Sequence, residues 1–243
     1  MLATLYSLQH CPYAMRARLG LLMARQQVML RAVTTKNKPA EMLAISPKGT
    51  IPVLILPDAK VIDESLDIML WALKQHDPED LLHKDQPADL PAMLELIRLN
   101  DQAFKPQLEI YKKAKRFHLE SEIKERQKCE VFIAELEQRL SRNERSAEAL
   151  LKEKLSKEAL SKVAPLNGES RRGYFIGQNP GLIDYALLPF VRQFSRVNRA
   201  WFIQAPYPKL RAWLDEHLQS RLYAKAMAKY PLWLDEHKEC LLG

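Results

Sequence analysis

Cys11 is the residue whose type and position best suit nucleophilic chemistry. It stands in the segment LYSLQHCPYAMR, directly after an apolar run and before Pro12, and apolar residues with helical spacing follow from Met15. Proline is favoured in the first turn of a helix, so we expect Cys11 at a helix N-terminus. Unpaired N–H groups and the helix dipole stabilise a thiolate there. A buried and unreactive cysteine is the alternative interpretation.

Cys11 has no second cysteine beside it. The position three residues later holds Ala14, so a mixed disulfide on Cys11 would need an external thiol for its release. The other two cysteines, Cys129 and Cys240, are far away in the sequence, and we interpret them as incidental thiols. An odd number of widely spaced cysteines does not fit a disulfide scaffold and favours a reducing, cytoplasmic location.

The segment GTIPVL holds a second candidate site. Pro52 opens a predicted strand, and the Ile51–Pro52 bond is a candidate for the cis form. A cis bond would turn the backbone N–H and C=O of Ile51 outward, where an extended peptide could pair with them as a short added strand. A proline that simply ends a loop is the alternative.

The segment DESLDI holds a third candidate site at a predicted helix start. Glu64 and Ser65 could simply cap the helix. They could also bind a free amino-acid end, with the Ser65 hydroxyl and N–H holding a carboxylate and Glu64 holding an ammonium group. The three sites together predict a ligand that has a thiol, a peptide backbone and a free amino-acid end, and glutathione has all three.

Hydrophobic periodicity predicts the elements that carry these residues. The first 75 residues are predicted to have the order β-α-β-α-β-β-α, in an α/β domain at 1–76. A polar, proline-rich linker follows at 77–90. Helical spacing then dominates, so 91–243 is predicted to be an all-helical domain with a charged, partly helical insertion at about 142–172. The predicted helices of this half are 91–116, 119–141, 182–196, 207–218 and 220–228.

The composition of the 243 residues is that of an ordinary globular protein, with 47% hydrophobic and 28% charged residues. The net charge of +7 permits an acidic partner, but acidic residues are mixed through the same segments, so we do not expect a nucleic-acid-binding protein. No apolar run approaches the length of a membrane helix, and the first residues lack a basic signal region; neither membrane insertion nor secretion is expected. No glycine-rich phosphate loop or metal-binding motif is present, and no metal is expected.

At this point the sequence resembles a known family. The first 75 residues look like the glutathione-binding, thioredoxin-like domain of glutathione transferases, and the whole chain resembles their two-domain fold with its helical second half. The closest pattern is that of the omega class. Five ordered motifs carry this resemblance, namely YS followed by CPYAMRARL, KNKP, SPKGTIPVL, the DES helix start and YFIGQNPGLIDYALLPF.

The resemblance implies a role for each candidate residue. Cys11 would form the mixed disulfide with glutathione, which serves as cosubstrate. The implied glutathione-binding residues are Lys38, Ile51, Pro52, Glu64 and Ser65. Of these, Lys38 would approach the glycyl carboxylate, although its sequence context alone indicates a solvated loop charge. The implied activities are thiol transfer, deglutathionylation and dehydroascorbate reduction on a small or protein substrate, and the implied assembly is a homodimer.

Several alternatives remain open from the sequence. Tyr6 or Ser7 could activate glutathione for conjugation to an electrophile instead. The chain could also be a non-catalytic binding protein that docks through the insertion at 142–172. Phe104 and Tyr111 could line a second-substrate site, or they could pack in a helical core. One departure from the family pattern is Gly181, which stands where a Ser or Thr usually opens a capping box with Asp184.

Overall fold

The computed structural model describes residues 1–158, 173–177 and 179–243, whose contacts form two compact units. The first unit consists of Met1–Leu82, Tyr185–Gln193 and His217–Gly243, and the second of His83–Asp184 and Phe194–Glu216. The last 27 residues, which the periodicity had grouped with the helical half, therefore pack with the N-terminal unit. The reason is a set of strand and side-chain contacts described below.

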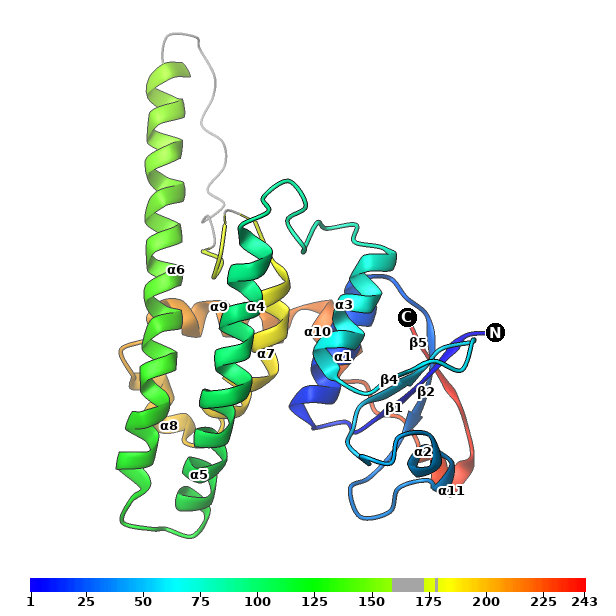
Figure 1. The fold of residues 1–243 in the computed structure, drawn as a ribbon. Helices are drawn as coiled ribbons and strands as arrows, with labels where there is room; N and C mark the ends of the chain where they lie inside the picture. The colour runs from blue at the N-terminus through cyan, green and yellow to red at the C-terminus, as the bar shows by residue number, and fades with distance from the viewer. Residues whose placement is uncertain (159–172, 178) are drawn as a thin grey trace. The chain divides into compact units, whose positions relative to one another are not determined.

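The first unit contains the predicted β-α-β-α-β-β-α order (Figure 1). Its elements are β1 (Ala3–Ser7), α1 (Pro12–Met23), β2 (Val28–Ala32), α2 (Ala40–Ile45), β3 (Val53–Ile55), β4 (Val61–Ile62) and α3 (Ser65–Gln75). The last part of the chain adds α10 (Arg221–Ala226), α11 (Trp233–Glu236) and β5 (Cys240–Leu242) to this unit.

The sheet has five strands in the order β4-β3-β1-β2-β5. β1 and β2 are parallel, with Leu5 opposite Leu30, while β3 runs antiparallel to β1 with Leu54 opposite Leu5. The predicted hairpin of β3 and β4 is confirmed. β5 was not predicted; it pairs antiparallel with β2, with Cys240 opposite Leu30, and thereby covers the edge of β2.

The two faces of the sheet carry different helices. α1 packs against α3 so closely that a Cβ added to Gly20 would lie 2.8 Å from the Cα of Met69. α2 lies on the other face of the sheet (Figure 1) and contributes Met42 to a cluster with Tyr6 and Val53. Because successive strand residues point to opposite faces, Tyr6 faces this cluster while its neighbour Ser7 faces α1.

The second unit is helical, as predicted. Its elements are α4 (Asp89–Leu99), the π-helix η1 (Asn100–Phe104), α5 (Lys105–Arg116), α6 (Glu122–Glu158), α8 (Arg199–Gln204) and most of α9 (Pro208–Gln219). α7 (Leu182–Ser195) follows the charged segment. The single helix predicted at 91–116 is thus a helical run with one π-helical turn. Part of the predicted insertion, residues 159–172, lies outside the described residues.

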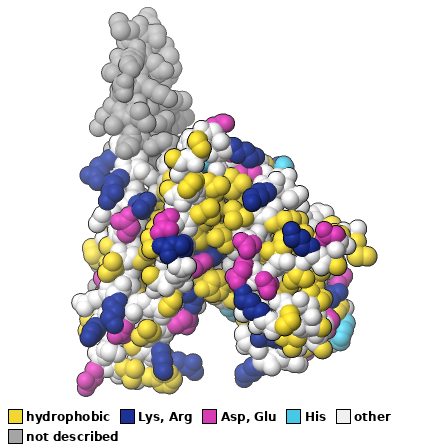
Figure 2. Space-filling view, viewed as in Figure 1, with side chains coloured by type: hydrophobic (Ala, Val, Ile, Leu, Met, Phe, Trp, Pro, Cys, Tyr) yellow, Lys and Arg dark blue, Asp and Glu magenta, His cyan; other side chains and the backbone are white. Residues whose placement is uncertain are grey.

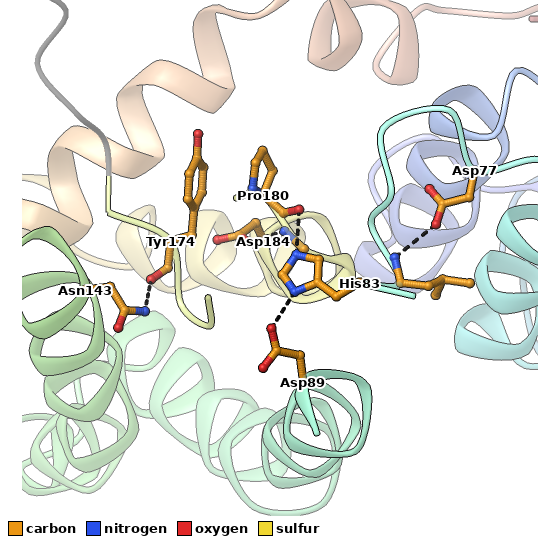
Figure 3. A network of polar contacts seen from close by, with 9 residues as sticks. Asp77, His83, Asp89, Asn143, Tyr174, Pro180 and Asp184 are labelled. Carbon is orange, nitrogen blue, oxygen red and sulfur yellow. Dashed lines mark hydrogen bonds and ion pairs between the residues drawn. The ribbon is translucent and has the colours of Figure 1, made fainter. Parts of the chain in front are cut away.

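Polar contacts hold the segment before α7 in place (Figure 3). His83 is buried, and its ring nitrogens lie 2.7 Å from Asp89 Oδ2 and 3.1 Å from the carbonyl oxygen of Pro180. The carboxylate of Asp184 accepts a hydrogen bond of 2.8 Å from the backbone N–H of Gly181. Half of the usual capping box therefore remains although Gly181 has no side chain to offer.

The surface has no region of one charge on the face shown in Figure 2, where basic and acidic side chains are interspersed. Ion pairs along one helix include Arg139 with Glu135 and Lys128 with Glu125 on α6. Within the part of the chain that the structure describes, no helix is both long and apolar enough to cross a membrane.

Candidate functional site

Cys11 lies where the sequence predicts it, as the N-cap residue of α1 with Pro12 in the first turn. Its backbone is extended and its thiol is half-buried. The thiol accepts no capping hydrogen bond from the helix; its sulfur lies 3.7 Å from the carbonyl oxygen of Ile51, to which the S–H donates. The nucleophile candidate and the proline loop, 40 residues apart in the sequence, therefore lie side by side.

The Ile51–Pro52 peptide bond is cis, as predicted. It lies directly before β3, and the preceding turn is closed by a hydrogen bond of 2.9 Å from the N–H of Gly49 to the carbonyl of Ser46. Gly49 has φ of +63°, a left-handed conformation that glycine adopts without strain. This turn delivers the backbone of Ile51 to the sulfur of Cys11.

Glu64 and Ser65 open α3, as predicted, with Glu64 as the N-cap residue. Ser65 is buried, whereas the Glu64 side chain is mostly exposed and pairs with Lys48 of the proline loop. This ion pair raises the pKa of Lys48. The neighbouring Asp63 accepts a hydrogen bond of 3.0 Å from the Ser46 hydroxyl, so two side-chain contacts fasten the proline loop to the start of α3.

Lys38 lies beside the same loop. A Cβ placed on Gly49 would be 3.8 Å from the Nζ of Lys38. Lys38 therefore lies beside the cis-proline loop, which side-chain contacts link to the start of α3. A carboxylate at one end of a bound peptide and an ammonium group at the other would meet charges of the opposite sign here.

Arg18 lies next to the candidate site, although the sequence did not predict a role for it. It lies seven residues after Cys11, two helical turns along α1, and its side chain is 2% exposed. Its guanidinium donates to the Ser7 hydroxyl and to the carbonyl oxygens of Leu8 (3.2 Å) and Gln9 (2.7 Å). Arg18 therefore holds the loop that leads into Cys11. The only sequence signal was a charged residue at a position with apolar spacing.

Tyr6 and Ser7, the alternative activating residues, both have occupied hydroxyl groups. Tyr6 is fully buried, and its hydroxyl accepts a hydrogen bond of 2.7 Å from Arg31. Burial raises the pKa of Tyr6, which opposes formation of a phenolate. The Ser7 hydroxyl, 2% exposed as a residue, accepts from Arg18.

Phe104 and Tyr111 lie in the aromatic core of the second unit. Phe104 stacks on Phe132 with ring centroids 4.9 Å apart, and both Phe104 and Tyr111 contact Phe194. Each is at most 3% exposed. Both residues thus pack in a helical core, which was one of the two interpretations of the sequence. A role for Phe104 and Tyr111 in binding a second substrate stays a prediction.

A cavity of about 160 Å³ lies next to the loop before Cys11. Its walls come from the β1–α1 loop, the end of β2 and the chain after α10, including Ser7, His10, Arg18, Thr34 and Tyr230. Among the described residues, no three His, Cys, Asp or Glu side chains gather closely enough to hold a metal ion.

Comparison with known protein families identifies the family of this chain. One family model, the N-terminal domain of glutathione S-transferases, matches residues 5–80, and a second, their C-terminal domain, matches residues 125–216. The chain belongs to the glutathione S-transferase family. A comparison with curated proteins finds no match.

Solved structures share the two-domain glutathione transferase fold over nearly the whole chain. Yeast Ure2p in complex with glutathione superimposes with a TM-score of 0.74 at 16% identity, over 93% of this chain and 94% of that one. Glutathione transferase Omega 3C from Trametes versicolor gives 0.70 at 19% identity, over 96% and 92%. A glutathione S-transferase from Methylobacterium radiotolerans, complexed with glutathione sulfonate, gives 0.65 at 20% identity, over 94% and 96%. At these identities the likeness shows the transferase fold.

Proposed function

We propose that this glutathione transferase is of the omega-like, cysteine type and catalyses glutathione-dependent thiol transfer. The observation that carries the proposal is the half-buried Cys11 sulfur at the N-terminus of α1, 3.7 Å from the Ile51 carbonyl in the cis-proline loop. A sulfur beside an open peptide backbone suits a peptide whose own sulfur must reach it. Glutathione in the solved complexes of Ure2p supports this choice of ligand.

The reaction takes two disulfide exchanges. The Cys11 thiolate attacks the glutathione sulfur of a glutathionylated substrate, so a Cys11–glutathione disulfide forms and the substrate leaves as a thiolate, which takes up a proton. A second glutathione, as thiolate, attacks the glutathione sulfur of that disulfide. Oxidised glutathione leaves, and the Cys11 thiolate is restored. One substrate disulfide is reduced, and the two glutathionyl groups end in oxidised glutathione.

The binding residues have complementary parts in this scheme. The Ile51 backbone beside cis Pro52 pairs with the cysteinyl part of glutathione. Glu64 and Ser65 hold the γ-glutamyl end, and Lys38 approaches the glycyl carboxylate. The N-terminus of α1 and the loop held by Arg18 favour the anionic form of the leaving and attacking sulfur. No metal takes part. Reduced glutathione is abundant in the cytoplasm, which we propose as the compartment; we propose a homodimer as the assembly.

Conjugation through Tyr6 or Ser7 is less favoured, because both hydroxyl groups are buried and already hydrogen-bonded. It predicts that Cys11→Ser keeps activity toward 1-chloro-2,4-dinitrobenzene. A non-catalytic binding protein is the third alternative. It predicts glutathione binding without any disulfide on Cys11.

The testing experiment is intact-mass measurement after brief incubation with oxidised glutathione, followed by peptide mapping. We expect one glutathione on Cys11 and its release by reduced glutathione. The half-buried Cys240 provides the matched control: Cys240→Ser should behave as wild type, and Cys11→Ser should take up no releasable glutathione and lose thiol transfer to the background rate. An unmodified Cys11 in folded protein, or thiol transfer retained by Cys11→Ser, would overturn the proposed mechanism.

A further inference from the structure

Arg18 carries a buried positive charge that no acidic side chain balances among the described residues. Its four hydrogen bonds go to uncharged oxygens, namely those of Ser7, Leu8, Gln9 and Ala226. Removing a charge from water costs several kcal/mol when no opposite charge compensates it. Such a residue is expected where an anion forms during function.

Cys11 lies close to Arg18, because the Leu8 carbonyl oxygen accepts hydrogen bonds of 3.2 Å from both the Arg18 guanidinium and the backbone N–H of Cys11. The other groups beside Arg18 that can become anionic, among the described residues, are Tyr223 of α10 and Tyr230 of the segment that follows α10. Burial lowers the pKa of Arg18 to about 10, and negative charge on these three groups acts in the opposite direction. Burial also raises the pKa of Tyr230, so this phenol stays neutral near neutral pH. Of the three groups, the Cys11 thiol is the one that acts as an anion in the proposed function.

We propose that Arg18 is the positioning residue of Cys11: its guanidinium is the counter-charge of the Cys11 thiolate and fixes the loop that presents the sulfur. This inference rests on the proposed role of Cys11 as nucleophile. It adds a charge that the helix N-terminus alone does not supply.

The same guanidinium ties the nucleophile to the C-terminal part of the first unit. Its Nε donates to the carbonyl oxygen of Ala226 at the end of α10, at 2.6 Å. The Gln9 side chain donates to the next carbonyl, that of Met227, at 3.2 Å. The loop before Cys11 is therefore held both by Arg18 and by the end of α10.

The test compares two substitutions that differ in charge, Arg18→Lys and Arg18→Gln. Both lose the planar fork of donors, but only lysine keeps the positive charge. The readout is the rate of Cys11 alkylation by iodoacetamide between about pH 5 and about pH 10, resolved by peptide mass spectrometry. Only the thiolate reacts, so the pH profile reports the stability of the anion.

We expect Arg18→Gln to slow alkylation of Cys11 about tenfold at pH 7 and to move the profile upward by about one pH unit, because one unit corresponds to a tenfold change. The rate at high pH, where the thiol is fully ionised, should change little. Arg18→Lys should stay within about threefold of wild type at pH 7. Equal profiles for folded Arg18→Gln and wild type would overturn the proposal.

Arg16 provides the matched control. It is on the same helix and is equally buried, with its guanidinium 4.5 Å over the ring of Phe190 and its Nε bonded to Ala186. Arg16→Gln should leave the pH profile of Cys11 unchanged. If Arg16→Gln shifted the pH profile of Cys11 alkylation as much as Arg18→Gln, the loss of any buried charge on α1 would have the same effect. That result would contradict a specific role for Arg18.

A measurement on unmutated Arg18 decides the question if Arg18→Gln does not fold. The 15Nε resonance of Arg18 should move as Cys11 ionises and should not move over that pH range in Cys11→Ser. A resonance indifferent to Cys11 would overturn the proposal. Iodoacetamide and NMR need no glutathione, so absence of thiol transfer together with the expected profile would reject the proposed function and leave the role of Arg18 standing.

Discussion

Among single residues, Glu64 already has a partner, because its carboxylate pairs with Lys48 of the proline loop. A ligand ammonium group would have to compete with Lys48 or join it. Both side chains are about half exposed or more, and exposed pairs contribute less than about 1 kcal/mol. The pair therefore orders the loop without blocking the carboxylate.

Glu64→Gln is expected to raise the KM for glutathione about two- to fivefold, since it removes one exposed charge interaction. The first attack of Cys11 on a glutathionylated substrate should slow less, because the substrate brings other contacts. The measurement is steady-state thiol transfer at varied glutathione. Lys48→Met is the matched control, since it frees Glu64 and should leave the KM equal or lower. An unchanged KM in Glu64→Gln would contradict the assigned role.

Asp184 should make stability depend on pH. Burial raises its pKa from 3.8 to about 7, against the N–H donors of Gly181 and Phe175. Between about pH 4 and about pH 7 the unfolded state loses this proton while the folded state keeps it, so stability falls as pH rises.

Urea denaturation of wild type and Asp184→Asn at several pH values measures this effect. Relative to the Asn variant, wild type should lose up to about 1.4 kcal/mol per pH unit in that window and level off above about pH 7. Asparagine can still accept from Gly181, so the cap remains. Parallel stability curves for the two proteins would show that Asp184 does not titrate in this range.

Among the helices and strands, the C-terminal segment fastens onto the sheet of the first unit. β5 covers the edge of β2, and the side chain of Glu239 just before it pairs with Arg31 at 2.6 Å. Arg31 also lies 4.1 Å over the ring of Trp233, whose Nε1 donates to Glu41 of α2. These contacts explain why the last residues group with the first unit. They also fix Arg31 on the Tyr6 hydroxyl.

The contact of α1 with α3 predicts the effect of Gly20→Ala. Alanine favours a helix by about 1 kcal/mol, but its Cβ would lie 2.5 Å from the Cγ of Met69 and 2.8 Å from its Cα. Overpacking of this kind costs about 1–3 kcal/mol, so we expect a net loss in the free energy of unfolding by urea.

The double variant Gly20→Ala, Met69→Ala is the control for this prediction. It should remain less stable than Met69→Ala alone, because the Cα of Met69 still obstructs the added methyl group. A gain of stability in Gly20→Ala would mean that the two helices are not packed this closely.

At the scale of the whole molecule, the described residues on either side of the charged segment lie close together in the second unit. Asn143 of α6 donates a hydrogen bond of 2.7 Å to the carbonyl of Tyr174. A Cβ on Gly173 would lie 2.6 Å from the carbonyl oxygen of Leu140, also on α6. α6 near Asn143 and the chain at Gly173 and Tyr174 therefore lie side by side.

Replacing residues 146–171 by a short Gly-Ser linker should change the free energy of unfolding by less than about 1 kcal/mol, because the ends are already close and a shorter loop costs little entropy. Thiol transfer should be unchanged. The measurements are urea denaturation and steady-state thiol transfer, with a linker of the original length as control. Lost thiol transfer in a folded variant would assign this segment a part in catalysis.

The sequence by itself determined the local features. Apolar spacing and the Cys11-Pro12 junction predict β1, α1 and a cysteine at the helix N-terminus, because turn chemistry and periodicity act within a few residues. The Ile51–Pro52 sequence likewise made a cis peptide bond before β3 a candidate, because proline lowers the free-energy cost of the cis isomer. These features depend on neighbours in the chain.

Only the tertiary structure decided the rest. Arg18 reads as one more charge on a helix until α1 is packed, when it meets Ala226, 208 residues away. Likewise, β5 has little strand signal in three residues and exists because β2 offers an unpaired edge. The Glu64 and Lys48 pair depends on a turn that returns the chain to α3. A contact between distant residues is set by how the helices and strands pack, and no local pattern encodes it.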